Sequence, residues 1–518
     1  MKKKALLGLI LAMTLCLSGC GNLLQNVTDG TEKNSEEVAT DIAGDSNEDA
    51  EASNSYLEVE FERHYDGLYE EIQLMYGHYE TVILHNTEYP ALADAVGLLN
   101  TEKNYDSQIY FEELKTSAQE DYKAYGAEYF SKYIYRSDMH ALRADSQVLS
   151  LVETCYDYAG GAHGFDYYNV TNFDVATGEK IALEDIVKDM NTLPAALETE
   201  FTEKYPDVES WMPSLKEAFE SYIEPADPNY APVFTWGLGY EGITFYFSSG
   251  EIAGYTEGTF QVTLSLSEYG DLFETDYFAN TDKNYVLYIP EDYVGLDTDL
   301  NDDGATDYVS IRNAYSEDME YITGYELVVN DCSLALENYC MEYDAYLVKT
   351  EDKNLVYVQR HMENGYGMID VFSVTEDTVE LVGEHGGTLT CFSNSKHFYV
   401  SKIFHLLSTY SATSEYCVGE DGLPATITGL YEVEGELSLV STVEITAELV
   451  NEEGYTTGEN KTFPAGTTFT FQCTDGESYV DVVTQDGVCC RFFTQEEWPT
   501  TVNGMDATTS FETLWFAG

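Results

Sequence analysis

The sequence predicts an α+β domain with a largely antiparallel sheet, followed by a β-rich region that forms a sandwich, a barrel or a partial propeller. Between residues 56 and 275, strand and helix patterns are grouped and do not alternate strictly. From residue 283 to 518, short alternating runs predominate and helical periodicity is scarce. Residues 21–55 are acidic and have almost no aromatic side chains, which predicts a disordered tether before the folded regions.

The first folded region contains one long helix packed on a sheet. Apolar residues recur at helical spacing from Phe111 to Tyr125, after the cap candidates Asp106 and Ser107. Two shorter apolar stripes predict helices near residues 193–205 and 211–222, the second ended by Pro225. Alternating runs predict the strands 57–61, 148–158, 165–173, 243–247 and 260–264.

The second folded region is predicted to consist of short strands. Clear alternating runs occupy residues 285–289, 325–329, 355–358 and 479–483. Turn signals at residues 463–467, 474–476 and 485–487 separate further β runs near the end. These signals predict a small barrel-like tail from about residue 440.

The first twenty residues have the pattern of a bacterial lipoprotein signal. Lys2 to Lys4 provide the positive region, residues 5–17 are apolar but too few to span a bilayer, and small residues precede Cys20. After cleavage, Cys20 becomes the first residue and carries the lipid, including palmitate. The alternative is an ordinary secretory peptide with an incidental cysteine. We therefore expect a protein anchored by its lipid on the extracytoplasmic face of the cell membrane.

The charge of the chain excludes some partners. It has 94 Asp and Glu against 24 Lys and Arg, a formal net charge of −70, spread over the whole length. Nucleic acid is therefore not an expected partner, whereas a cationic protein is electrostatically permitted. Solubility on a crowded surface is the simpler explanation of so much acid, because net charge does not identify a ligand.

Eight cysteines remain after Cys16 and Cys20 are assigned to the signal region. Their spacings show no regular disulfide framework and no C-x-x-C motif. Buried free thiols are at least as well supported as disulfides. Zinc has little support from the sequence, because no pair of histidines stands at a ligand spacing near a pair of cysteines.

Three blocks of the first region resemble a known extracellular domain. They are Tyr156-x-Tyr158-x-Gly160-Gly161-Ala162-His163-Gly164, Asn172-x-Asp174-x-x-Thr177-Gly178 and Leu183-x-Asp185-Ile186, and further matches follow at residues 245–258. This order of blocks is similar to the domain shared by RsiV-type anti-sigma factors and the N-terminal part of PdaC-type peptidoglycan deacetylases. The resemblance covers roughly residues 56–273, less than half of the chain.

The resemblance implies a binding domain. In RsiV-type proteins the domain is a receptor for lysozyme, a basic enzyme, and that role suits the acidity of this chain. The sequence shows neither the membrane helix and cytoplasmic sigma-binding segment of those proteins nor the Asp-Asp and His-x-x-x-His metal motifs of the deacetylases. We therefore expect neither sigma-factor sequestration nor deacetylase activity, and no enzyme.

The glycine-rich corner at Gly160, Gly161, His163 and Gly164 is a candidate structural or binding turn. The glycines suit positive φ angles, and a histidine in such a turn more often caps backbone groups than performs chemistry. No Ser or Cys nucleophile in a recognisable elbow accompanies His163. Catalysis is thus the less favoured interpretation.

One motif in the second region predicts calcium binding. Asp299, Asn301, Asp303, the carbonyl of Ala305 and Asp307 place oxygen donors at alternate positions around Gly304. Ser310 stands where an EF-hand has its bidentate Glu, and a strand-like run follows at once. The stretch instead resembles the calcium loops between strands of integrin-type propeller repeats, in a single copy. The expected role of the ion is to stiffen the loop, and the alternative is a metal-free Asx turn.

Three classes of function follow. The first is a lipid-anchored binding protein that recognises lysozyme or another cationic protein. The second is a non-catalytic cell-envelope module that binds peptidoglycan or another glycan, and the third is an envelope hydrolase. Surface rows of aromatic rings favour glycan, whereas an acidic concave patch favours a basic protein. The hydrolase is disfavoured because no catalytic constellation emerges from the sequence.

Overall fold

The computed structural model describes residues 56–85, 88–225, 232–274, 276–279, 283–290, 294–316, 321–451, 454–495 and 500–516. Residues 53–518 form one compact unit. The predicted signal, Cys20 and the tether lie outside the described residues. None of the described helices is long and apolar enough to cross a membrane.

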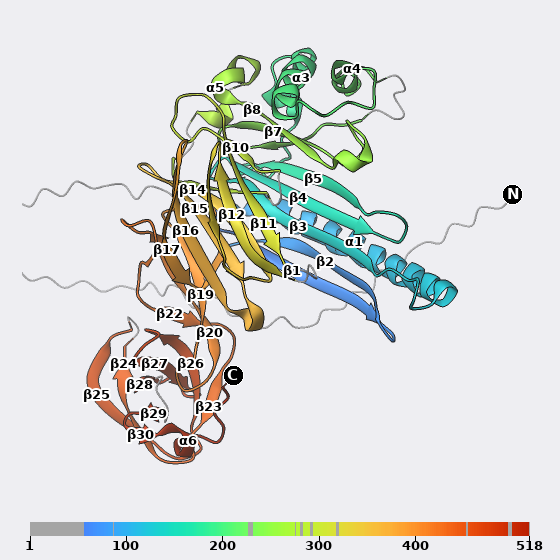
Figure 1. Cartoon of the computed structure of the whole chain (residues 1–518). Helices are drawn as coiled ribbons and strands as arrows, with labels where there is room; N and C mark the ends of the chain where they lie inside the picture. The colour runs from blue at the N-terminus through green and yellow to red at the C-terminus, as the bar shows by residue number, and fades with distance from the viewer. Residues whose placement is uncertain are drawn as a thin grey trace, which may run out of the picture. The chain divides into compact units, whose positions relative to one another are not determined.

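The first sheet has five strands, in the order β1-β2-β3-β4-β5, and the long helix α1 packs on it. Most neighbouring strands are antiparallel, but β2 and β3 run parallel because α1 forms the crossover between them. Figure 1 shows α1 lying along one face of this sheet. The bounds are β1 (Val59–Tyr69), β2 (Gln73–Leu84), α1 (Pro90–Tyr125), β3 (Tyr133–Ala144), β4 (Val148–Tyr158) and β5 (Phe165–Asp174).

The long helix begins earlier than the sequence pattern indicates. It starts at Pro90 and ends at Tyr125, so Asp106 and Ser107, which we expected to cap it, lie within the helix. Its first half buries only Leu92 and Val96, a spacing too sparse to produce a clear apolar stripe. Phe111, Leu114 and Ala118 are buried against the sheet, as their periodicity predicts.

A smaller sheet of β6, β7 and β8 follows, covered by α3 and α4. Its apolar core joins Leu197 and Phe201 of α3 to Phe245 and Phe260 of the strands. Figure 1 shows it beyond the β5 edge of the first sheet. The bounds are α2 (Leu183–Ile186), α3 (Leu193–Lys204), α4 (Leu215–Glu220), β6 (Thr235–Leu238), β7 (Gly242–Phe247), β8 (Phe260–Ser265) and α5 (Leu266–Tyr269), with 3₁₀ turns η1 (Met190–Thr192), η3 (Tyr255–Glu257), η4 (Gly270–Leu272) and η5 (Asp276–Phe278).

The β-rich region begins with two sheets that share one apolar core. One has the order β10-β11-β12-β13 and the other β17-β16-β15-β14-β9, and Val309, Leu327, Val356 and Phe372 meet between them. The bounds are β9 (Tyr285–Tyr288), β10 (Leu296–Thr298), β11 (Asp307–Tyr315), β12 (Ile322–Val329), β13 (Cys332–Leu336), β14 (Glu342–Lys349), β15 (Asn354–His361), η6 (Glu363–Gly365), β16 (Gly367–Thr375) and β17 (Thr378–Gly386).

The last sheet has eleven strands and stays open. Its order runs from β18 through β19, β20, β22, β26, β27, β28 and β24 to β25, with β21 and β23 beside this path. The strands are β18 (Thr388–Thr390), β19 (Phe398–Phe404), β20 (Tyr410–Val418), β21 (Pro424–Thr426), β22 (Tyr431–Val433), β23 (Ser438–Val440), β24 (Ile445–Val450), β25 (Thr456–Phe463), β26 (Thr468–Thr474), β27 (Tyr479–Thr484) and β28 (Cys489–Phe493), followed by β29 (Thr501–Val502), β30 (Met505–Asp506) and α6 (Ala507–Ser510).

The fold class predicted from the sequence is confirmed: an α+β part is followed by several antiparallel β-sheets. The barrel alternative is wrong, because none of the sheets formed by the described residues closes into a barrel. The strands after residue 440 instead continue the large sheet through the pairing of β22 with β26. Turn signals fix where strands end, but they do not fix which strands pair.

Candidate functional site

A cavity of about 330 Å³ lies between the first sheet, the small β6–β8 sheet and the start of the β-rich region. Its walls come from alternate residues of the first sheet, since side chains on a strand point to opposite faces in turn. On β3, Arg136, Asp138 and His140 line the cavity, whereas Tyr135 packs towards α1. The other walls include Thr244, Tyr246, Gln261, Leu287, Tyr288, Asp297, Glu342 and Asp344. We call this cavity the cleft.

Three side chains form a cross-strand group on one wall of the cleft. Arg136 pairs in register with Tyr156, and Tyr156 with Asp166, so the three stand side by side on β3, β4 and β5. The Arg136 guanidinium carbon lies 5.1 Å from the centre of the Tyr156 ring. Burial raises the pKa of the Asp166 carboxyl, and Arg136 opposes this rise. The group offers a ring face, a cation and a carboxylate to a ligand.

The glycine-rich corner adjoins this group. Gly160 and Gly161 adopt φ angles of 84° and 101°, which favour glycine. At Gly164 a Cβ would stand 2.5 Å from the Tyr156 ring, so the absence of a side chain lets the corner pack on that tyrosine. The corner is therefore shaped by its glycines, and Tyr156 links it to the cleft.

A row of aromatic rings runs from the corner along the start of β5. His163 stacks on Tyr255 at 3.9 Å between ring centres, and Phe165 lies nearly parallel to Tyr255 at 6.3 Å and to Tyr167 at 5.7 Å. Phe165 is 42% exposed, and His163 is also exposed. We call these four residues the aromatic row. The Nδ1 atom of His163 lies 3.3 Å from the neighbouring carbonyl oxygen of Gly164.

The deep end of the cleft is a network of charges. Arg63 of β1 contacts Glu80 and Asp138 at 2.8 Å and Glu342 at 3.6 Å, so one cation joins the first sheet to β14. Glu80 is buried, and burial raises the pKa of its carboxyl against the effect of Arg63. His78 also contacts Asp138, at 2.8 Å.

His140 stands at the same end of the cleft and stacks on Tyr288 of β9, with 3.4 Å between ring centres. Burial lowers the pKa of His140 to about 4. Nearby, His361 pairs with Asp344 at 2.7 Å. Burial lowers the pKa of His361, but the hydrogen bond to Asp344 and the charges of Asp344 and Glu342 together outweigh it, and the pKa is raised. The pKa values of the two histidines are thus shifted in opposite directions.

A second cavity, of about 500 Å³, lies on the other side of this network. It shares Arg63, His140, Tyr288, Glu342 and Asp344 with the cleft. Its other walls include Glu60 of β1, Met139 of β3 and Cys391 in the chain around β18. The charged residues thus form a wall common to both cavities.

The predicted calcium loop connects β10 and β11, next to the cleft residue Asp297. The Asp299 carboxylate accepts the backbone N–H groups of Asp303 and Gly304, at 3.2 and 2.8 Å. Asp303 accepts the N–H of Ala305, and Asp307 accepts that of Leu300, both at 2.8 Å.

The loop turns sharply at Asp302 and Gly304, with φ angles of 59° and 87°. Its four aspartates are not among the carboxyl, imidazole and thiol groups whose ligand atoms gather within 4.8 Å in the described part of the chain. The carboxylates close the loop in this geometry, and a bound ion would compete for the same oxygens.

The sequence pointed to the corner and the calcium loop, but not to the cleft. The corner was visible because glycines and a histidine are neighbours in the sequence. Arg136, Asp138 and His140 are ordinary strand residues, and their role depends on β7, β9 and β14 lying opposite them. The only available signal was the alternation of charged residues along β3.

The eight cysteines of the described residues are free thiols, and Cys155, Cys340, Cys391 and Cys490 are buried. Cys155 packs on the α1 side of β4, where burial raises the pKa of its thiol to about 11. Such a thiol is inert at neutral pH.

A family model described as "protein of unknown function (DUF3298)" matches residues 183–267. This segment holds α2 to α4 and the β6–β8 sheet, which form one side of the cleft. The chain is similar to a solved DUF3298-family structure from Bacteroides fragilis, at 18% identity over 43% of this chain and 96% of that one, with a TM-score of 0.31. It is also similar to a DUF3298-family structure from Pseudomonas aeruginosa, at 14% identity over 44% and 99%, with a TM-score of 0.26. No curated protein matches the chain.

Proposed function

We propose that this protein is a non-enzymatic binding protein of the cell envelope, which holds its ligand at the aromatic row and the adjoining cleft. Cys20 carries the lipid that anchors it to the extracytoplasmic face of the membrane, and residues 21–55 give the folded part its reach. The aromatic row is the observation that carries this proposal: His163 and Phe165 are exposed, and Tyr167 also lines the cleft. Exposed rings that adjoin a polar cavity are typical of binding sites.

Cell-wall glycan is the ligand class that the geometry favours. Phe165 is exposed and lies nearly parallel to Tyr255, and an exposed ring face suits the flat apolar face of a sugar ring. Asp166 and Arg136, on the neighbouring wall of the cleft, supply hydrogen-bonding groups for hydroxyls and amides. A cavity of about 330 Å³ suits a sugar unit with its substituents.

A cationic protein, such as lysozyme, is the second candidate, and the charge favours it. The formal net charge is −70, and the cleft contains Asp138, Asp166, Glu241, Asp297, Glu342 and Asp344 against Arg63 and Arg136. The resemblance of residues 156–186 to the lysozyme-binding domain of RsiV-type proteins supports the same candidate. Such binding is electrostatic and weakens as salt screens the charges.

The experiment titrates the full chain with soluble peptidoglycan fragments and, separately, with catalytically inactivated lysozyme. Tyr255→Ala and Phe165→Ala should each weaken fragment binding about tenfold, since a lost stacking partner costs roughly 0.5–1.5 kcal/mol beyond area burial. The matched control is Phe493→Ala, because this phenylalanine of β28 is 46% exposed, close to the 42% of Phe165.

Three outcomes separate the candidates. Fragment binding that the row variants weaken and Phe493→Ala does not supports the glycan candidate. Saturable lysozyme binding that disappears at high salt supports the cationic protein instead. The absence of both, or equal affinities in all variants, contradicts a ligand at the aromatic row.

A further inference from the structure

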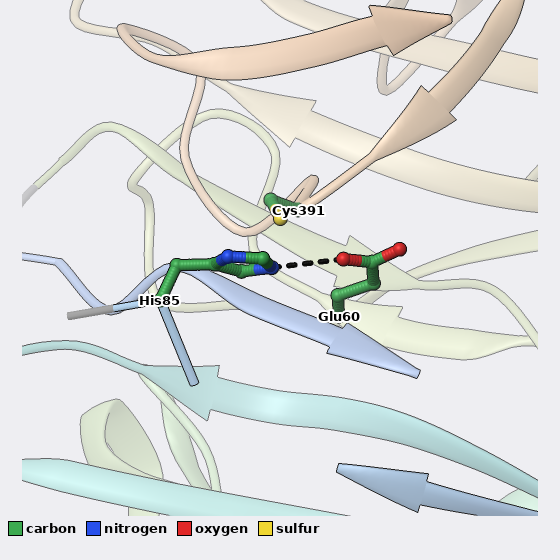
Figure 2. A group of neighbouring side chains, drawn as sticks. All are labelled: Glu60, His85 and Cys391. Atoms are coloured by element: carbon green, nitrogen blue, oxygen red, sulfur yellow. Dashed lines mark hydrogen bonds and ion pairs between the residues drawn. The ribbon is translucent and has the colours of Figure 1, made fainter. Parts of the chain in front are cut away.

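Three potential metal ligands meet where the first sheet contacts the chain around β18. They are Glu60 of β1, His85 directly after β2 and Cys391 directly after β18. One carboxylate oxygen, one imidazole nitrogen and the sulfur all lie within 4.8 Å of one another. Figure 2 shows the imidazole and the carboxylate joined by a dashed line, with the thiol on the loop beside them.

We propose that Glu60, His85 and Cys391 bind a divalent zinc-class cation. Sulfur, nitrogen and oxygen together form a donor set that Zn²⁺ accepts, whereas calcium and magnesium prefer oxygen alone. Zn–S and Zn–N bonds of about 2.3 and 2.0 Å place tetrahedral ligand atoms roughly 3.3–3.8 Å apart. Separations of up to 4.8 Å therefore need to shorten by about 1.5 Å at most.

The backbone holds all three ligands in place without an ion. The N–H of His85 donates to the carbonyl of Glu58 at 3.0 Å, which fixes the end of β2 against β1. The hydroxyl of Ser393 donates to the carbonyl of Leu57 at 2.5 Å, and the side-chain amide of Asn394 donates to the carbonyl of Asn284 at 2.6 Å. Ser393 and Asn394 are buried, so the loop that carries Cys391 is tied to β1 and to the chain before β9.

Cys391 itself adopts an unusual conformation. Its φ is 51°, a left-handed angle that costs energy for any residue with a Cβ. Such strain gathers at functional sites, where the surrounding structure holds a side chain in a required direction. Here the strained residue turns its sulfur towards Glu60 and His85.

The charge around the sulfur favours a cation. The carboxylate of Glu60 lies within 4.8 Å of the Cys391 sulfur and accepts a hydrogen bond from His85 at 2.8 Å, so a negative charge already stands among the three donor atoms. A divalent ion would displace the thiol proton, take the imidazole nitrogen and offset the carboxylate charge.

A bound ion would join two segments that are far apart in the sequence. Glu60 and His85 belong to the first sheet, and Cys391 comes about three hundred residues later in the chain. An ion bound to the folded form alone raises the stability of that form. His85 is 42% and Glu60 37% exposed at their side chains, so a fourth position remains open to solvent or ligand.

Cobalt(II) is the probe, because thiolate ligation gives a charge-transfer absorption band that oxygen ligands do not give. The untagged full chain should bind one Co²⁺ with such a band, and Zn²⁺ should remove the band by displacing cobalt. Cys391→Ser should abolish the band. His85→Ala should weaken binding at least tenfold. The matched control, Cys489→Ser, removes an exposed thiol of β28 and should keep the band unchanged.

A second measurement, the melting temperature, distinguishes the loss of a metal ligand from a folding defect in Cys391→Ser. His85 is partly exposed, so His85→Ala removes a ligand without opening a cavity in the core. Zn²⁺ should raise the melting temperature of the wild type and of Cys489→Ser, but not that of His85→Ala. A wild type without a charge-transfer band, a band that survives unchanged in Cys391→Ser, or a cobalt affinity that is unchanged in His85→Ala overturns the proposal.

Discussion

The cleft and the second cavity share one wall but are built in different ways. The largest share of the cleft comes from strands of the first sheet, which place Arg136, Tyr156 and Asp166 side by side through simple register, and the small β6–β8 sheet and the β-rich region supply the rest. The second cavity joins β1 to residues 388–393, more than three hundred positions later. The first sheet thus lines two cavities, one through the register of adjacent strands and one through contact with a segment far away in the sequence. The charged network around Arg63 separates them and joins the two parts of the chain.

The largest expected effect on stability comes from removing Arg63 from the wall that the two cavities share. Arg63→Ala should lower the free energy of unfolding by about 2–4 kcal/mol, because it leaves the buried Glu80 carboxylate without its cation. Denaturant unfolding measures the loss. Lys115→Ala is the control, since this lysine bonds the more exposed Asp66 and Glu112 and should cost about 0.5 kcal/mol. Equal losses of unfolding free energy in the two variants would mean that the charged network around Arg63 adds no more stability than an exposed ion pair.

A smaller effect should appear as a dependence of stability on pH. The pKa of His140 is about 4 in the folded chain, because burial outweighs the opposing effects of Asp344 and Asp138, while Arg63 lowers it further. The unfolded value is about 6.5, so the unfolded chain binds more protons between these two pH values. His140 therefore contributes stability above pH 6.5 that is lost as the pH falls towards 4.

At pH 5 this loss amounts to about 2 kcal/mol relative to neutral pH. His140→Phe keeps a ring to stack on Tyr288 but cannot titrate. Urea unfolding at pH 7 and pH 5 should show a loss in the wild type that exceeds the loss in His140→Phe by about 2 kcal/mol. Identical losses in the two proteins would exclude His140 as a buried neutral group.

The calcium loop, which adjoins the cleft, should have the smallest effect on stability. If it binds calcium, an ion at ten times its Kd stabilises the fold by about 1.4 kcal/mol. Asp303→Asn, at an exposed loop position, should remove this gain while retaining an acceptor for the N–H of Ala305. Thermal unfolding with calcium and with chelator measures the difference. A wild type with the same melting temperature in both conditions would support the metal-free turn.

The sequence predicted the parts whose signals are local. The alternating run 148–158 coincides with β4, and the glycines at 160 and 161 do adopt positive φ angles. The start of α1 was missed, because a largely exposed helix needs no apolar stripe over its first sixteen residues. The prediction of a barrel-like tail was wrong, because the strands after residue 440 pair with the large sheet, and turn residues do not specify which strands pair.

The two candidate cation sites show the same limit of prediction from local sequence signals. The calcium loop spans Asp299 to Asp307, so its spacing can be read directly from the sequence. Glu60, His85 and Cys391 have no spacing that a motif could capture, and the sequence accordingly gave zinc little support. Only the pairing of β1 with β2 and the buried loop after β18 bring the three together.

Amide hydrogen exchange tests most directly the claim that the ligand binds at the aromatic row and the cleft. Saturating peptidoglycan fragments should slow exchange in residues 148–174, which hold β4, the glycine-rich corner and β5, and in the segment around Tyr255. Residues 445–493 of the large sheet should keep their exchange rates. Protection confined to the large sheet, or unchanged exchange rates throughout at a ligand concentration that saturates binding, would contradict ligand binding at the aromatic row and the cleft.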